Sequence, residues 1–574
     1  MRTLLNYLKP VAGRIGLGVF IKAIGTMVEL LLPAILSHVL KVVVARRSLQ
    51  EILLWGGIMI VCATVAVIMN VKANRMAARV SRDFSRSVRH DLFQRTLHLS
   101  AAQTDYFTIP SLESRITTDT YNVHNFVGMM QRMGIRAPIL LLGGIIITLI
   151  MDSTLALVMI AVMPFLFVLV TFVRRKGTPL YSNVQKSVDN MVRVVREDAQ
   201  GIRVIKALSK NEYEHRRYDA VNRKLASDER KAGINMGMVH PIMTVLMNGG
   251  IVAVVALAAG RVAGGKSDPE TVIAFMQYFT QISMAMMALS RMFVMYTKCS
   301  ASARRISEVL NAPEDLVVQS EADYPAKSTD AHIEFEDVSF SYLGRRDNME
   351  HISFSLPKGG SLGIIGATGS GKSTLVKLLM RFYDVGSGSI RINGRDVRTI
   401  PHDEFYAMFG AAMQYDFLYA DTIEENIKFG RDLTHEQVVE AAVTAQADDF
   451  ITGFADGYGH MLAQKGTNIS GGQKQRLLIA RAVAAKPEIL VLDDSSSALD
   501  YKTDAALRRA LKERVTEATV VTVAQRVSSI KDCDLILVLE DGAIIGAGDH
   551  EHLMATCPEY KEISDSQMGG AFVE

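Results

Sequence analysis

Cysteine and net charge are both scarce in this sequence. The 574 residues include only four cysteines, which lie far apart with no CxxC or Cys/His spacing, at Cys62, Cys299, Cys533 and Cys557. This spacing argues against a zinc site or a disulfide framework, so we expect free, buried thiols. The formal net charge is only +3, from 63 basic and 60 acidic residues, and gives no reason to expect a nucleic-acid partner.

The N-terminal segment does not have the pattern of a signal peptide. It carries Arg2, Lys9 and Arg14, but no apolar core that ends at a small-residue cleavage site. We therefore expect a helix on the cytoplasmic surface of a membrane.

Apolar residues, in contrast, are abundant and make up 49% of the chain. A chain of 574 residues also exceeds the roughly 250–300 residues at which single cores stop growing, which indicates two domains. The apolar residues gather in the first half, in runs near or above the roughly 20 residues that a spanning helix needs. Six such stretches lie at about 16–44, 52–71, 134–151, 154–173, 238–263 and 271–297.

The loops between these stretches predict the orientation in the membrane. The segments after the second and fourth stretches are long and rich in arginine and lysine, so the positive-inside rule places them in the cytoplasm. Both keep helical periodicity and are expected to extend the membrane helices as cytoplasmic hairpins. Six crossings then place both termini in the cytoplasm. Arg46 and Arg47, in the short first outer loop, run against the rule.

The second half of the chain has a different pattern. A polar stretch, NAPEDLVVQSEADYPAKSTDA, precedes a region in which β-rich runs alternate with helical patterns. We expect a transmembrane domain at 1–312, a linker at 313–330 and an α/β domain at 331–574. The predicted fold class is a multi-domain membrane protein, with an all-α six-helix transmembrane domain followed by an α/β nucleotide-binding domain.

A phosphate-binding loop is the strongest motif. Gly366-Ala-Thr-Gly-Ser-Gly-Lys372-Ser373 follows the apolar run SLGII and precedes the helical run TLVKLLM, which is the strand–loop–helix context that G-x-x-x-x-G-K-S requires. The glycines let backbone N–H groups turn toward phosphates, Lys372 reaches the β- and γ-phosphates, and Ser373 offers a hydroxyl to Mg²⁺. This motif predicts binding of ATP with Mg²⁺.

Two further motifs follow in order. The apolar run EILVLDD ends in Asp493, where a carboxylate can hold the water shell of magnesium. Just before it, Ile469-Ser470-Gly471-Gly472-Gln473 resembles the LSGGQ signature of ATP-binding cassettes, with isoleucine at the first position. The whole chain resembles the half-transporters of ATP-binding-cassette exporters, and the cassette resemblance covers about residues 331–574.

The resemblance implies roles for further residues. Tyr342 resembles the aromatic residue that stacks on adenine, although a core tyrosine on a strand would also explain it; Gln414 resembles the glutamine that senses Mg²⁺. Ser497 to Asp500 resembles the loop at the interface between two cassettes. The implied nucleotide-binding residues are Tyr342, Gly366, Ala367, Thr368, Gly369, Ser370, Gly371, Lys372, Ser373, Thr374 and Gln414. The implied metal-binding residues are Ser373, Gln414 and Asp493.

In this family two cassettes close head to tail. Ser470, Gly471, Gly472 and Gln473 would therefore complete the ATP site of the partner chain, and the phosphate loop would form a site with the signature of the partner.

The sequence departs from the family at two expected catalytic positions. The residue after Asp493 is normally glutamate and here is Asp494; the switch histidine is replaced by Gln525. A carboxylate shortened by one methylene retracts by roughly 1.5 Å, and an error of about 1 Å can cost on the order of 10²-fold in rate. An amide also cannot carry the positive charge that histidine can bring. The pattern resembles the degenerate-site subunit of bacterial heterodimeric multidrug exporters, and we expect weak hydrolysis at this chain's own site.

A smaller departure lies before the signature. Gln464 and Lys465 stand where the family usually has glutamate and arginine. This change could alter coupling between the cassette and the membrane helices.

The sequence indicates the transported substrate less clearly than it indicates the ATP site. The fifth and sixth stretches are rich in methionine, which suits varied apolar ligands but is also ordinary core filler. Glu29, His38 and His240 interrupt the spans and could be functional or satisfied between helices. We expect export of hydrophobic or amphipathic compounds from the cytoplasmic side of the plasma membrane. Lipid or peptide export, or a regulatory membrane ATPase that transports nothing, remain alternatives.

Overall fold

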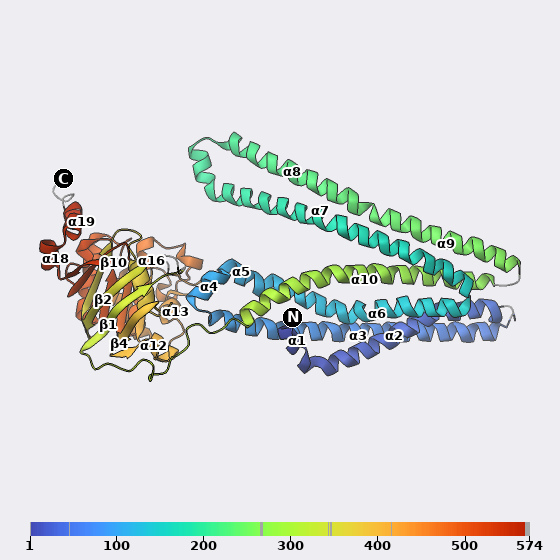
Figure 1. The fold of residues 1–574 in the computed structure, drawn as a ribbon, viewed down its shortest axis with the longest axis horizontal. Coiled ribbons are helices and arrows are strands. Elements are labelled where there is room, and N and C mark those ends of the chain that lie inside the picture. The colour runs from blue at the N-terminus through green and yellow to red at the C-terminus, as the bar shows by residue number, and fades with distance from the viewer. Residues whose placement is uncertain are drawn as a thin grey trace. The chain divides into compact units, whose positions relative to one another are not determined.

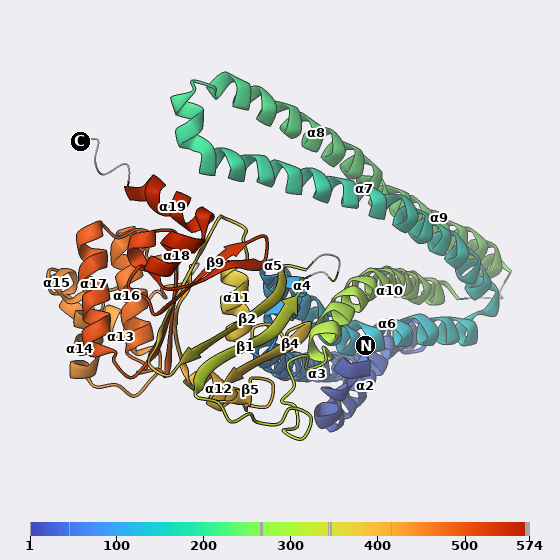
Figure 2. The ribbon, with the colours of Figure 1, turned by 60° about the vertical axis from the view of Figure 1, so that its left-hand side comes forward.

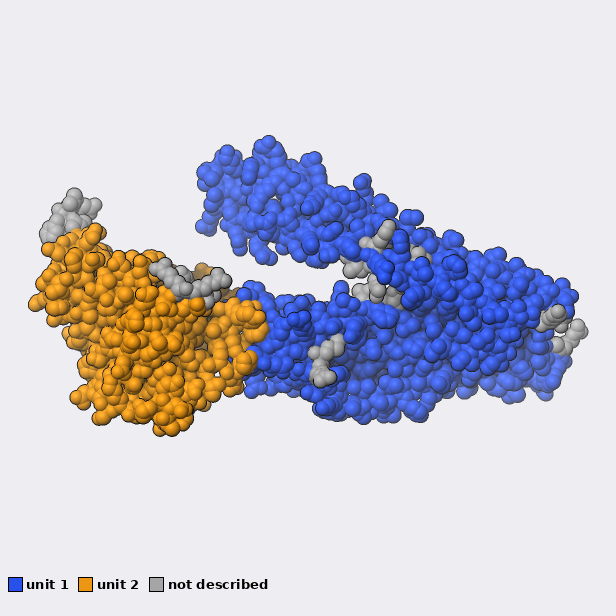
Figure 3. All heavy atoms as spheres, in the orientation of Figure 1, with its two compact units in different colours: residues 1–98, 108–312 blue, residues 99–107, 313–574 orange. Residues whose placement is uncertain are grey.

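The computed structural model describes residues 2–44, 46, 48–264, 268–342, 344, 347–414 and 416–568. The chain divides into two compact units, which Figure 3 shows in different colours. Unit 1 comprises Met1–His98 and Thr108–Ala312, and unit 2 comprises Leu99–Phe107 and Pro313–Glu574. The short segment 99–107 therefore belongs to the same unit as the C-terminal half of the chain.

Unit 1 consists of helices, most of them long (Figure 1). Its α-helices are α1 (Arg2–Asn6), α2 (Ala12–His38), α3 (Leu49–Leu97), α5 (Ile109–Ser114), α6 (Thr120–Met151), α7 (Ser153–Ala207), α8 (Asn211–Gly237), α9 (Val239–Ala263) and α10 (Pro269–Leu310). Shorter helical turns are η1 (Lys9–Val11), η2 (Val39–Val43) and η3 (Arg115–Asp119).

The expected membrane spans fall on these helices. Among the described residues, five helices are long and apolar enough to cross a bilayer, and they overlap the first, second, third, fifth and sixth expected stretches. The fourth stretch forms the start of α7, where Ser153–Phe165 is a shorter apolar helix and some side chains further along lie outside the description. The all-α membrane unit is as predicted, whereas the count of six spans stays a prediction.

The cytoplasmic extensions are continuous with the spanning helices. Helix α3 runs on from its apolar part to Leu97, and α7 runs on to Ala207 before α8 returns beside it (Figures 1 and 2). Asp152 begins α7 as its N-cap, because its Oδ1 accepts hydrogen bonds from the backbone N–H groups of Thr154 and Leu155. These hairpins match the long helical segments that the sequence predicts.

Unit 2 contains two sheets and the helices around them. The four-stranded sheet has the order β2-β1-β4-β5, and the six-stranded sheet has the order β10-β9-β3-β8-β7-β6. The strands are β1 (Ala331–Phe340), β2 (Met349–Pro357), β3 (Ser361–Gly366), β4 (Ser387–Ile392), β5 (Arg395–Asp396), β6 (Phe409–Ala412), β7 (Ile489–Asp493), β8 (Thr519–Val523), β9 (Leu535–Glu540) and β10 (Ala543–Gly548).

The helices of unit 2 include α4, which comes from the first half of the chain. They are α4 (Ala101–Phe107), α11 (Lys372–Leu379), α12 (His402–Ala407), α13 (Ile423–Lys428), α14 (His435–Thr444), α15 (Asp448–Thr452), α16 (Gly471–Val483), α17 (Tyr501–Arg514), α18 (His550–Thr556) and α19 (Pro558–Met568), with turns η4 (Gly457–Gly459), η5 (Gln464–Gly466) and η6 (Val527–Ser529). This is the α/β unit that the alternating pattern predicts.

The larger sheet determines where the site forms. Strands β3, β8, β7 and β6 are adjacent and parallel, so their carboxyl ends meet at one edge. Ligands of open α/β sheets bind outside this edge. Each of the four strands is followed there by residues that the sequence singled out.

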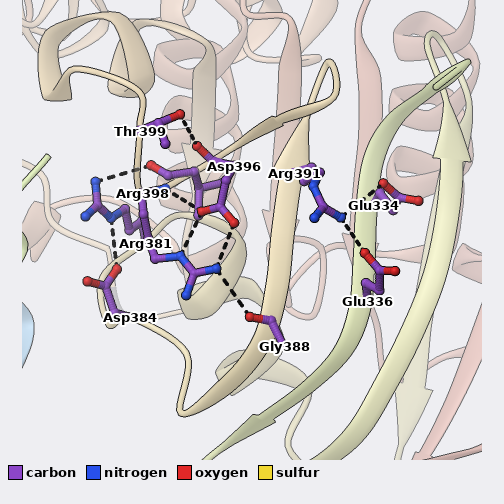
Figure 4. A network of polar contacts seen from close by, with 10 residues as sticks. Glu334, Glu336, Arg381, Asp384, Gly388, Arg391, Asp396, Arg398 and Thr399 are labelled. Carbon is purple, nitrogen blue, oxygen red and sulfur yellow. Dashed lines mark hydrogen bonds and ion pairs between the residues drawn. The ribbon is translucent and has the colours of Figure 1, made fainter. Parts of the chain in front are cut away.

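A polar network fixes the far end of the helix that follows the phosphate loop (Figure 4). Arg381, just after α11, is 1% exposed and donates to the carboxylate of Asp384 at 2.9 Å. It also donates to the backbone carbonyls of Val397 and Val317. These bonds connect the end of α11 to β5 and to the linker, and hence hold the helix whose first turn bears Lys372.

Candidate ATP site

The phosphate loop connects β3 to α11 and has the backbone that its glycines permit. Gly366, Gly369 and Gly371 have φ values of +156°, +90° and +104°. A Cβ at Gly371 would lie 2.7 Å from the sulfur of Met349, so a larger residue would have to displace it. The loop is therefore a tight cradle that only glycine fits at this point.

Lys372 lies across this cradle. Its Nζ donates to the carbonyl oxygens of Gly366 and Ala367 at 2.9 and 2.8 Å. Burial lowers the pKa of its ammonium, while the nearby carboxylates of Asp494 and Asp493 oppose that shift. Ser370 carries a buried hydroxyl with no hydrogen-bond partner among the described residues. Glycine-lined backbone, a lysine and hydroxyls are the donor set that polyphosphates require, and the loop fits ATP.

Two oxygen groups lie at the start of α11 and the end of β7. The hydroxyl of Ser373 donates to Asp493 Oδ1 at 3.4 Å, and Asp493 is only 2% exposed. Burial raises the pKa of the Asp493 carboxyl, which makes an added positive charge favourable there. A hydroxyl and a carboxylate side by side suit Mg²⁺, which prefers oxygen ligands. These two residues would hold Mg²⁺, which would supply positive charge beside the phosphates of a bound nucleotide.

Asp494 is held at the centre of the opposite end of the site. Its Oδ2 accepts from Gln525 Nε2 at 3.0 Å and from Gln414 Nε2 at 3.3 Å. Its backbone has a φ of +51° and its N–H donates to the carbonyl of Val523. Gln414 follows β6, Asp494 follows β7 and Gln525 follows β8, so three neighbouring strands bring the three side chains together.

One cleft contains most of the expected site residues. It is lined by Asn348, Thr368, Gly369, Gly371, Lys372, Ser373, Thr374, Gln414, Asp493, Asp494, Val523, Ala524 and Gln525. The binding end and the expected hydrolytic end are thus parts of one site.

Tyr342 lies beside the phosphate-loop helix. Its hydroxyl donates to Thr374 Oγ1 at 3.3 Å, and 39% of its surface is exposed. Its ring packs against the rings of Phe340 and Tyr383, with centroids 4.9 and 5.1 Å away. An exposed tyrosine supported by other aromatic rings suits stacking on a base.

The signature residues form the start of α16. Ser470 is the N-cap: its hydroxyl accepts from the backbone N–H of Gln473 at 3.3 Å, and the Gln473 side chain accepts from the N–H of Ser470 at 2.9 Å. A Cβ at Gly471 would meet only Ala498 Cβ, at 3.6 Å, so this position opens away from the unit's own atoms. These residues do not line the cleft described above. This is the arrangement expected if they serve another chain's ATP.

Sequence reasoning missed two connections to the site. Gln475 donates to Ser497 Oγ at 3.0 Å and accepts from the N–H of Ala498 at 2.9 Å, which ties the signature helix to the loop after Asp494. The repeated glutamine in GGQKQR was the available signal. The hydroxyl of Tyr383 donates to Asp105 Oδ2 at 2.6 Å, and this bond connects α4 to the aromatic group around Tyr342. No local pattern indicates that pairing.

Comparisons with known proteins agree with this architecture. The family model for the ABC transporter transmembrane region matches residues 15–286, and a second family model, described as ABC transporter, matches residues 349–497. "Uncharacterized ABC transporter ATP-binding protein YfiB" of Bacillus subtilis (strain 168) is 32% identical, over 99% of this chain and 99% of its own length. The chain belongs to the ABC transporter family.

A second relative and a solved structure also match this chain over nearly its whole length. An ABC transporter ATP-binding protein of Mycobacterium tuberculosis (strain CDC 1551 / Oshkosh) is 31% identical, over 99% of this chain and 98% of its own. A solved structure, "Structure of a bacterial Atm1-family ABC exporter with ATP bound", superimposes with a TM-score of 0.81, covering 98% and 99% of the two chains at 22% identity. The chain is thus an ABC half-transporter with an exporter fold, a multi-pass membrane protein whose ATP-binding domain is cytoplasmic.

Proposed function

We propose that this half-transporter pairs with a different half-transporter and binds ATP at its own phosphate loop without hydrolysing it efficiently. The observation that carries the proposal is the position of Asp494, whose Oδ2 accepts hydrogen bonds from both Gln525 and Gln414. A general base must reach the proton that it removes. This carboxylate is one methylene shorter than glutamate and is already engaged by two amides.

Binding and hydrolysis are thereby separated within the chain. The positions of Lys372, Ser373 and Asp493 support binding of ATP with Mg²⁺. In a head-to-tail dimer, the intact signature at Ser470 and Gly471 would complete the partner's site. A homodimer would carry the altered residues at both sites, so a different partner with glutamate and histidine at these positions is favoured.

The cargo that we propose is a hydrophobic or amphipathic compound moved outward across the membrane. The exporter fold and the apolar, methionine-rich α9 and α10 support it. ATP-dependent accumulation of a fluorescent amphipathic dye in inside-out vesicles tests this proposal. Accumulation should require this chain and its partner together; if ATP is hydrolysed by the pair but no dye of the series accumulates, export of this class is wrong.

A further inference from the structure

Helices α2, α3 and α6 pack together in unit 1 (Figures 1 and 2). Four charged residues lie on α2 and α6. Lys22 and Glu29 are seven residues apart on α2 and so share a helix face, and Arg132 and Arg136 are one turn apart on α6. Lys22 lies within electrostatic range of the other three. Glu29 is the only acidic residue of α2, and α6 has none. Three cations are therefore balanced by one carboxylate.

The cluster lies at the depth of the membrane. Arg136 is fifteen residues before the outer end of α6 at Met151, a distance of about 22 Å at 1.5 Å per residue. Since the hydrocarbon layer is about 30 Å thick, Arg136 and its partner Glu29 lie in the inner half of that layer. Lys22, two turns nearer the cytoplasm, lies close to its inner edge. Charges at this depth are costly, and they mark substrate or ion sites more often than structural ones.

Most N–H donors of Lys22 and Arg136 make no hydrogen bond to another residue of the cluster. Lys22 is 4% exposed. Among the described residues, its Nζ makes one hydrogen bond, to Asn74 Oδ1 at 3.1 Å. Arg136 Nη2 donates to Glu29 Oε1 at 2.6 Å. An ammonium has three N–H donors and a guanidinium five, so most donors in the cluster remain available to a ligand.

Two buried polar atoms of the cluster, Arg136 Nε and Glu29 Oε2, have no hydrogen-bond partner among the described residues, and neither has Asn70 Oδ1 on the adjacent helix α3. Asn70 lies beside α2, because a Cβ at Gly25 would be only 3.4 Å from its backbone nitrogen. A buried polar atom without a hydrogen-bond partner is destabilising. An excess of positive charge together with unpaired donors and acceptors is the environment of a polar ligand.

We propose that this cluster, defined by Lys22, Glu29, Asn70, Arg132 and Arg136, binds the anionic head group of an amphipathic molecule from the inner half of the membrane. The head group would be a phosphate or carboxylate that accepts from Lys22 and Arg136, with a neighbouring hydroxyl or amine to donate to Asn70. The inference rests on the proposed export function and narrows its cargo to anionic amphiphiles. Both a membrane phospholipid and a soluble amphiphilic acid have this chemistry.

Opposite effects of two substitutions distinguish a ligand site from an ion pair that only holds the helices together. Arg136→Gln removes a ligand cation, whereas Glu29→Gln removes the one repelling charge. A purely structural pair would be harmed by both changes. Arg261→Gln is a matched control, because Arg261 Nε donates to Asp152 at 3.2 Å in another partly buried pair outside the cluster.

The probe is a dansyl-labelled undecanoic acid, titrated without ATP against the full transporter, this chain with its partner, in phosphatidylcholine nanodiscs. The acid should bind at least about tenfold tighter than its methyl ester. Arg136→Gln should remove the preference for the acid over the ester, and Glu29→Gln should keep or increase it. The Arg261→Gln control should leave the preference unchanged. Equal binding of acid and ester, or equal losses in Arg136→Gln and Glu29→Gln, would overturn the proposal.

Adding phosphatidylglycerol to the nanodiscs identifies the source of the anion. If the site takes a phospholipid, this lipid should weaken binding of the acid to the unaltered transporter, but not to the Arg136→Gln variant. If the site takes a soluble acid, phosphatidylglycerol should leave the affinity unchanged. Both results support an anionic head-group site. Because binding is measured without ATP, loss of the acid preference would leave the vesicle transport result, and hence the export proposal, intact.

Discussion

The phosphate-binding end of the ATP site and its opposite, hydrolytic end differ in how closely they follow the chemistry that each requires. At the first end, Lys372 follows a loop whose glycines adopt the necessary backbone, and its Nζ donates to the carbonyl of Gly366. The next residue, Ser373, donates to Asp493 at the end of β7. At the second, Asp494 is shortened and bound by two amides, one of them from Gln525. We propose that the site keeps ATP binding while its means of activating water is weakened. Lys372 and Ser373 follow β3, whereas Gln414 and Gln525 follow β6 and β8, and β7 supplies a carboxylate to each end.

The largest effect should come from the signature, which we propose acts on the partner's ATP. Gly471→Val adds bulk where the partner's ATP is expected and should reduce ATP hydrolysis of the complete transporter by about 10²-fold or more, since a misplacement of about 1 Å can cost on the order of 10²-fold in rate. The new Cβ would meet only Ala498 Cβ within the unit, at an ordinary contact distance of 3.6 Å, so we expect the cassette to fold. Steady-state ATPase activity together with a thermal melt tests this. Normal activity in the folded variant would place the signature outside the competent site.

The next largest effect should come from the phosphate loop and tests whether this loop binds ATP. Lys372→Ala should abolish ATP binding at this chain's own site, because Lys372 is the cation that spans the loop. Photolabelling with azido-ATP and separation of the two chains measures it. Labelling of this chain should disappear, while the partner's label remains. Persisting label on this chain would show that the loop is not the binding element.

A smaller effect separates stability from function at Ser470. Ser470→Ala removes the N-cap of α16 and should lower the free energy of unfolding by about 1 kcal/mol. Thr434→Ala is a matched control, since Thr434 caps α14 with the same reciprocal bonds to Gln437. Both variants should lose similar stability in denaturant titrations. Only Ser470→Ala should also lose ATPase activity; equal activity in the two would reduce Ser470 to a cap.

Gln525 should have a still smaller effect on turnover. Gln525→Ala releases one of the two amides on Asp494. If this end contributes as little to turnover as we propose, hydrolysis by the complete transporter should change by less than about twofold. Steady-state ATPase assays check it. A large gain or loss would show that the Gln525–Asp494 contact controls the rate.

Local motifs explain how much the sequence could predict. The phosphate loop, Asp493 and the signature are runs of neighbouring residues, and their spacing alone indicates β3, α11, β7 and α16. The bonds from Gln414 and Gln525 to Asp494 depend on which strands lie side by side, and no local pattern encodes that order. The domain limits at 312 and 331 likewise remain a prediction. A single limit in the sequence could not indicate that residues 99–107 belong to the same unit as residues 313–574.

The contacts of the charged residues within the membrane could not be predicted from the sequence either. The sequence indicates that Glu29 is unusual, but its partner Arg136 is 107 residues away and the excess of cations appears only when α2 and α6 pack together. His38 lies against Trp55, with ring centroids 5.0 Å apart, whereas the side chain of His240 lies outside the described residues. Long-range packing, which period and composition do not specify, decides which of these residues form a site.

The most direct test of the proposed asymmetry compares one substitution at each ATP site of the same reconstituted heterodimer. Asn has the size of Asp and tolerates the positive φ of position 494, so Asp494→Asn removes the charge alone. We predict that Asp494→Asn lowers steady-state ATPase activity by less than about threefold, whereas the partner's Glu→Gln change nearly abolishes it. If Asp494→Asn proves as damaging as the partner's change, with ATP binding and assembly intact, Asp494 is the working base and the account is wrong.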